Sequence, residues 1–185
     1  MERILASALL VGLGGCSATP INQSHGPSIT ASERLIDAFY SFDPERLRAA
    51  MPDATPSQAK LLFYQGWAEG AHYRVLGRKP CRLAAEDEIT CDVTVRDDLI
   101  AALETGYWVT DTFHLKLRDG RIVKVRNSSN DPPAFDQAME WTSSNRPEVM
   151  IGPCKGFFAG GPTPQDCARA VVASFAAYRE ATRQR

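Results

Sequence analysis

The apolar residues of this chain change their spacing near residue 72, and this change limits the folds available to it. Before that point they recur at helical spacing, as in the stripe formed by Tyr64, Trp67, Ala68 and Ala71. After it they alternate with polar residues, most regularly between residues 89 and 95. Helices followed by a run of antiparallel strands predict an α+β domain, in which N-terminal helices pack on one face of a curved sheet.

Capping and turn residues set the expected limits of these elements. Thr30-Ala-Ser-Glu33 has the pattern of a capping box, so we expect the first helix, and the domain, to begin at Thr30. Asp43-Pro44 and Thr55-Pro56 each start a further helix, the second of which reaches about residue 72. Asp119-Gly120 predicts a tight hairpin. The other expected elements are strands over 73–78, 89–96, 107–117 and 121–127, a helical turn over 97–104, a helix over 133–144, an irregular segment over 151–162 and a final helix from 163.

Length and composition indicate one globular domain. The chain has 185 residues, of which 44% are hydrophobic and 23% charged, so it can bury a core and is not extensively disordered. The formal net charge of -1 removes the electrostatic reason to expect nucleic acid as a partner.

The N-terminal segment has the features of an export signal. A short charged region containing Arg3 precedes an apolar run over residues 4–13, which is too short to span a bilayer as a helix. The sequence Leu13-Gly14-Gly15-Cys16 resembles the lipobox of bacterial lipoproteins, in which the cysteine is lipidated and becomes the mature N-terminus. The alternative is a buried N-terminal segment with an incidental cysteine. We therefore expect a signal peptide over 1–15, and a lipidated Cys16 with a flexible tether over 16–29.

The chain has five cysteines, and lipidation of Cys16 would leave an even number for pairing. In an exported chain, disulfides form and persist. The two close pairs suggest the bridges Cys81–Cys91 and Cys154–Cys167, although four cysteines permit three connectivities. A zinc site is the rival interpretation, but neither pair has the two- to four-residue spacing usual for structural zinc.

The order of the elements, together with the strand sequence Thr110-Asp-Thr-Phe-His-Leu-Lys-Leu-Arg-Asp-Gly-Arg-Ile-Val-Lys-Val, resembles the nuclear-transport-factor-2-like superfamily, and its SnoaL-like polyketide cyclase branch in particular. The resemblance implies a cone-like, cystatin-like roll over 30–145. It also implies that 146–185 forms a disulfide-stapled loop and a C-terminal helix packed on the domain. The superfamily contains isomerases, dehydratases, cyclases, epoxide hydrolases and binding proteins, so the fold alone does not imply a function.

Asp111 is the polar residue with the most unusual place in the strand pattern. It shares the parity of Phe113 and Leu115, so its carboxylate should face the apolar side of the sheet. Burial would raise its pKa, which suits acid–base chemistry near neutral pH. In the neighbouring strand Asn127 has the inward parity and should lie near it. The alternative is that Asp111 lies at the rim of the sheet, bonded to water or to an arginine.

Other candidates have both structural and functional interpretations. Tyr40, Trp67 and Tyr107 either fill the core or line a ligand cavity. His72, at the change from helix to strand, either caps the helix C-terminus or faces the pocket. His114 has the opposite parity to Asp111 and is expected on the solvated side of the sheet. No cluster of His, Asp or Glu has metal-ligand spacing, so we expect neither a metal nor a cofactor.

These observations lead to three functional hypotheses. The first is an envelope lipoprotein, anchored to the cell membrane or outer membrane, whose exported domain binds a small apolar molecule or a protein. The second is an enzyme of the isomerase, dehydratase or cyclase type that uses Asp111 as acid or base. The third is a scaffold that forms a homodimer through its sheet face. The candidate residues are Asp111, Tyr40 and His72 for catalysis, and Trp67, Tyr107 and Asn127 for ligand binding.

Overall fold

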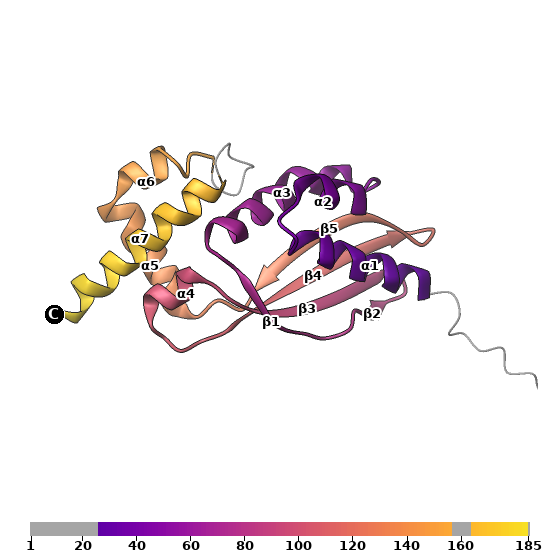
Figure 1. The fold of residues 1–185 in the computed structure, drawn as a ribbon, viewed down its shortest axis with the longest axis horizontal. Coiled ribbons are helices and arrows are strands. Elements are labelled where there is room, and N and C mark those ends of the chain that lie inside the picture. Colours follow the sequence, from indigo (N-terminus) through magenta and orange to yellow (C-terminus); the bar gives the residue numbers. More distant parts are fainter. Residues whose placement is uncertain (1–25, 157–163, 185) are drawn as a thin grey trace, which may run out of the picture.

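A computed structural model of the chain describes residues 26–156 and 164–184, and it confirms the α+β class. Its antiparallel sheet has the strand order β1-β3-β4-β5, and β2 pairs with a separate stretch of β3 (Figure 1). The strands are β1 (Arg74–Arg78), β2 (Arg82–Ala85), β3 (Glu88–Arg96), β4 (Val109–Arg118) and β5 (Arg121–Ser129). The predicted signal peptide and Cys16 lie outside the described residues.

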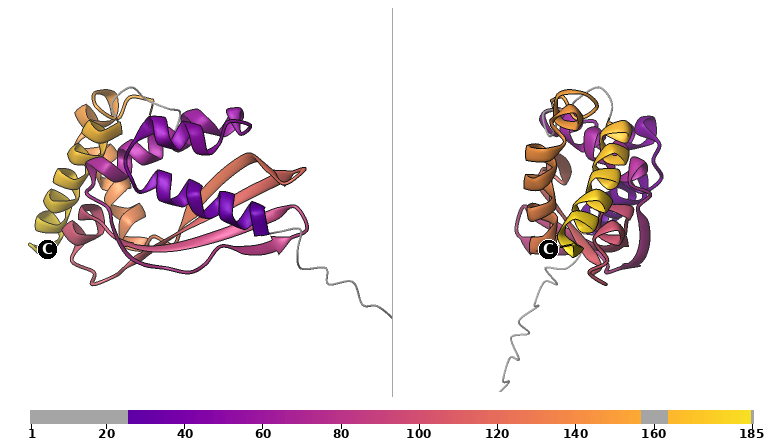
Figure 2. Two further views of the ribbon diagram at one scale, coloured as in Figure 1. Left: turned by 45° about the vertical axis from the view of Figure 1, so that its right-hand side comes forward. Right: turned by 90° about the vertical axis from the view of Figure 1, so that its left-hand side faces the viewer.

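Three N-terminal helices lie on one side of the sheet; the first and third contact it, and the second packs against these two helices (Figures 1 and 2). They are α1 (Gly26–Phe39), α2 (Pro44–Ala50) and α3 (Thr55–Gly70). The predicted start of α1 at Thr30 is wrong, because the helix begins at Gly26 and the Thr30 hydroxyl donates to the Gly26 carbonyl. Residues 26–29 of the expected tether are therefore helical. The cap of α2 is as predicted, since the Asp43 carboxylate accepts from the amides of Glu45 and Arg46.

The central strands follow the alternation in the sequence. Along β4, the residues of one parity from Val109 to Leu117 are buried, and those of the other parity are half-buried or exposed. The predicted hairpin joins β4 to β5, and both of its turn residues have positive φ, 51° at Asp119 and 73° at Gly120. A register shift between Lys116 and Leu117 lies just before this turn. The aromatic rings of Phe39 and Phe113 meet edge to face in the core, with centroids 5.0 Å apart.

The outer strands differ from the expectation. All five residues of β1 are exposed, so its apparent alternation does not mark a buried face. The sequence pattern missed β2, which is also exposed throughout. The predicted disulfide Cys81–Cys91 is present and ties the segment before β2 to the centre of β3. The outward residues of β3 and β4 are mainly polar, as in the contact between the Thr112 hydroxyl and the Asp92 carboxylate at 2.9 Å.

Four helices complete the fold at one end of the sheet (Figure 1). They are α4 (Asp98–Leu103), α5 (Pro133–Asn145), α6 (Pro147–Ile151) and α7 (Pro164–Arg183). The sequence pattern did not predict α6. The second predicted disulfide, Cys154–Cys167, joins the turn after α6 to the first turn of α7. A Cβ atom at position 70 would lie 2.4 Å from the Gln165 carbonyl oxygen. Because Gly70 has no side chain, α7 can approach α3 this closely.

Among the described helices, none combines the length and the apolar character that crossing a membrane requires.

Candidate functional site

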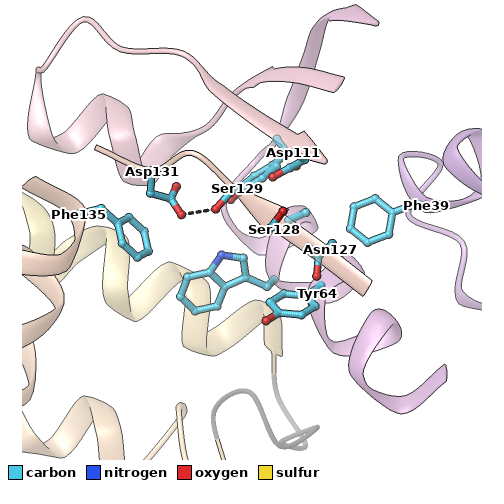
Figure 3. A pocket seen from close by; sticks show the side chains of 11 residues that line it. Phe39, Tyr64, Asp111, Asn127, Ser128, Ser129, Asp131 and Phe135 are labelled. Carbon is cyan, nitrogen blue, oxygen red and sulfur yellow. Dashed lines mark hydrogen bonds between the residues drawn. The ribbon is translucent and has the colours of Figure 1, made fainter. Parts of the chain in front are cut away.

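A cavity of about 240 Å³ lies where α3, β4, β5 and the start of α5 converge. Phe39 and Phe135 stand at its two sides, and Tyr64 of α3 lies below it in the view of Figure 3. Trp67, also of α3, is a further lining residue. The sheet contributes Asp111 from β4 and Asn127 from β5. Five of the lining side chains are aromatic, and polar groups gather on the sheet side, a combination that is usual in small-molecule sites.

Asp111 faces this cavity from the inward side of β4. Its side chain is 5% exposed, as the strand alternation predicted. The Tyr40 hydroxyl donates a hydrogen bond to its Oδ2 at 2.7 Å. Tyr40 directly follows the last residue of α1, so the packing of α1 on the sheet brings the phenol to the carboxylate. The two residues that sequence reasoning paired loosely are in direct contact.

Burial changes the proton affinity of this pair. Desolvation raises the pKa of Asp111 to about 7, against an ordinary value of 3.8. The hydrogen bond from Tyr40 acts in the opposite direction, because it stabilises the ionised carboxylate. The pKa of Tyr40 is raised far above its usual range by burial and by the negative charge of Asp111. Near neutral pH, Asp111 can therefore gain or lose a proton while Tyr40 keeps its own.

Two more carboxyl groups surround Asp111, and the sequence analysis missed both. Asp97 caps α4 by accepting from the Ile100 amide at 2.9 Å, and burial raises its pKa to about 6. Asp131 follows β5, accepts a hydrogen bond from the Ser129 hydroxyl, and has a pKa raised mainly by burial (Figure 3). The negative charges of both groups further raise the pKa of Asp111.

Tyr73, also missed, stands among these carboxyl groups and lines the cavity. Its pKa is raised well above the ordinary value by burial first, and then by the charges of Asp97, Asp111 and Asp131. It also hydrogen-bonds with the Trp67 side chain. Because an indole nitrogen can only donate, the phenolic proton of Tyr73 stays available for another acceptor.

The structure separates two predicted residues from this group. Tyr107 precedes β4, is 39% exposed, and lines a different cavity together with Trp108. His72 is not among the residues that line the cavity of Asp111; its Nδ1 lies 2.7 Å from Asp98 Oδ2, and its side chain is 63% exposed. Trp67 and Asn127 do line the cavity of Asp111.

The polar groups of the cavity suit proton transfer and hydrogen bonding. Asp111 can act as base or acid, and Tyr73 can donate to an oxygen atom of a bound molecule. Within the described part of the chain, no group of three or more His, Cys, Asp or Glu side chains could hold a metal ion.

No family model, curated protein or solved structure matches this chain.

Proposed function

We propose that the cavity binds a small, partly apolar molecule and that Asp111 exchanges a proton with it. The observation that carries the proposal is the hydrogen-bonded pair of Asp111 and Tyr40, 2.7 Å apart, in which the buried carboxylate also lines a cavity with five aromatic side chains. A buried carboxylate whose donor, within the described part of the chain, is one neutral hydroxyl favours the fold less than an apolar residue would. Its place at a cavity gives a functional reason for that cost.

The reaction class that fits is proton transfer next to a carbonyl group. Asp111 removes a proton from the carbon beside the carbonyl through the oxygen not bonded to Tyr40. The electron pair of the broken C–H bond forms a C=C bond to the carbonyl carbon, and the π pair of the C=O bond moves to the oxygen. Tyr73 donates a hydrogen bond to that oxygen as its negative charge develops. In a β,γ-unsaturated carbonyl compound, return of the proton from Asp111 to the γ carbon re-forms the C=O bond and completes an isomerisation. In a β-hydroxy carbonyl compound, re-formation of the C=O bond instead expels the hydroxyl group, which takes the proton from Asp111 and leaves as water, and this completes a dehydration.

We also propose that the domain is a lipoprotein with a nuclear-transport-factor-2-like, cone-shaped roll. The support is the lipobox-like sequence ending at Cys16, the two disulfides, and the antiparallel sheet under N-terminal helices. Disulfides accord with an oxidising compartment. Cys16→Ser should move the protein from the membrane fraction to the soluble fraction; unchanged fractionation would refute lipidation.

Proton transfer can be tested without knowing the natural substrate. The purified protein is incubated with a panel of small cyclic ketones in heavy water, and deuterium uptake next to the carbonyl is followed by NMR. We expect uptake that increases as the pH rises through about 7, because Asp111 must be ionised to act as base. Asp111→Asn should abolish it, whereas His114→Gln, on the outward side of the sheet, should not. Uptake that is equal in the wild type and in Asp111→Asn would exclude this role.

The same cavity also suits a binding protein without turnover, because apolar aromatic side chains, among them Phe39, Trp67 and Phe135, line it. In that case the ketones bind and no deuterium enters them. This second function would be identified if the ketones perturb the Trp67 indole resonance but take up no deuterium with the wild type or with Asp111→Asn.

A further inference from the structure

A second cavity adjoins the first on the same face of α3. Its volume is about 260 Å³, and it lies between α3 and the edge strand β5. The two cavities share Tyr64 and Asn127, so these side chains stand at the boundary between them. In Figure 3 the amide of Asn127 and the ring of Tyr64 lie beside each other at this boundary. A molecule that fills the first cavity can therefore extend past them into the second.

The two cavities have opposite electrostatic character. The first contains the carboxyl groups of Asp111 and Asp131. The second is lined by Lys60 and Arg126 and by no acidic residue. Among the described residues, no carboxylate forms an ion pair with either of these two cations. Their charges are therefore available to a bound anion.

Tyr64 connects the cationic end to the aromatic walls. The Lys60 ammonium lies 5.6 Å from the centroid of the Tyr64 ring, within the range of a cation–π contact. This contact directs the ammonium toward the boundary residue. An anionic group in the second cavity would therefore contact Lys60 next to Tyr64, the residue that also lines the first cavity.

We infer that the ligand of this protein is an amphiphilic carboxylate. Its apolar part, with the reacting carbon, would occupy the cavity of Asp111, and its carboxylate would lie in the second cavity beside the Lys60 ammonium. The inference rests on the proposed function, and it adds the substrate class. A carboxylate placed the other way round would meet Asp111 and Asp131, and repulsion between the negative charges disfavours that orientation.

A matched pair of probes tests this charge preference. Naphthylacetate and naphthylacetamide have nearly the same size and apolar surface and differ in one charge. Binding is measured by NMR at about pH 6, where naphthylacetate is ionised and Asp111 is still mostly neutral. The resonances followed are the Trp67 indole N–H and the Asn127 side-chain amide, which report the cavity of Asp111, and the Trp108 indole N–H, which reports the separate cavity lined by Tyr107 and Trp108.

We expect naphthylacetate to bind roughly two- to fivefold more tightly than the amide, the ratio for one partly solvated charge pair. Lys60→Gln should remove this ratio without changing the affinity of the amide. Lys124→Gln is the control, because Lys124 is exposed on β5 and lines neither cavity. Both substituted lysines are exposed, so neither variant is expected to unfold.

The outcomes separate this inference from the proposed function. Equal binding of the two probes, unaffected by Lys60→Gln, overturns the carboxylate preference and leaves the cavity as a ligand site. Perturbation of Trp108 alone, or of no resonance, overturns the ligand site and the inference together.

Discussion

The burial of Asp111 makes a quantitative prediction about stability and pH. Folding raises the pKa of this carboxyl from 3.8 to about 7, so the folded state holds the proton more tightly than the unfolded state does. Its contribution to the free energy of unfolding must then fall as the pH rises between these two values. At about 1.4 kcal/mol per pKa unit, the loss between about pH 5 and about pH 8 is about 3 kcal/mol.

Asp111→Asn isolates this contribution, because the amide has nearly the same shape, can still accept from Tyr40, and cannot ionise. The difference in unfolding free energy between variant and wild type should shift by about 3 kcal/mol in favour of the variant from about pH 5 to about pH 8. This difference is measured at each pH by urea unfolding with both disulfides intact, with tryptophan fluorescence as the signal. Asp53→Asn, at an exposed ion pair with Arg121, is the matched control and should show little shift. A difference that stays constant with pH would refute the burial of an ionisable Asp111.

Three further variants test other parts of the fold. Tyr40→Phe removes the hydroxyl that donates to Asp111. It should lower stability by about 1–3 kcal/mol above the pKa of that carboxyl, and by less at about pH 5, as the same urea titrations would show. Replacing both Cys154 and Cys167 by alanine should lower stability by about 3 kcal/mol, because the bridge restrains the unfolded chain across 13 residues; a calorimetric Tm unchanged by the double substitution would contradict this. Gly70→Ala places a methyl group against the backbone of α7 and should cost about 1–3 kcal/mol, measured as a lower Tm, whereas an unchanged Tm would mean that α7 moves away freely.

Local patterns predicted the central part of the fold because neighbouring residues determine it. The parity of β4 placed Asp111 on the inward side, and Asp119-Gly120 identified the hairpin. The same patterns failed where neighbouring residues moved the start of a helix or a strand away from the position that the pattern indicated. Thr30 occupies a capping-box position, yet Gly26 starts the helix with a proline at its second position. Tyr107 continues the parity of β4, but the backbone turns through Gly106 at φ 69° before the strand begins.

The remainder of the site comes from tertiary packing that spacing along the chain does not encode. Asp97 caps a short helix, Asp131 follows the last strand, and Tyr73 precedes the first, so each has an ordinary local role. Only the arrangement of β1, β3 and β5 in one sheet brings them around Asp111. From the sequence, Asp97 is recognisable only as a helix N-cap, and residues at N-caps are far more often structural than functional.

The division of one sheet edge into two short strands has a consequence for assembly. β1 has five residues and β2 has four, and each pairs with a different stretch of β3. The segment that contains Pro80 connects these two strands along the edge. Proline has no amide hydrogen, and the disulfide at Cys81 holds this crossing against β3. On the opposite edge, the Ser57 hydroxyl of α3 already accepts from the Val125 amide of β5. The edge formed by β1 and β2 therefore offers no long uninterrupted row of main-chain groups, so it resists extension by a strand from another molecule and amyloid-like growth from that side.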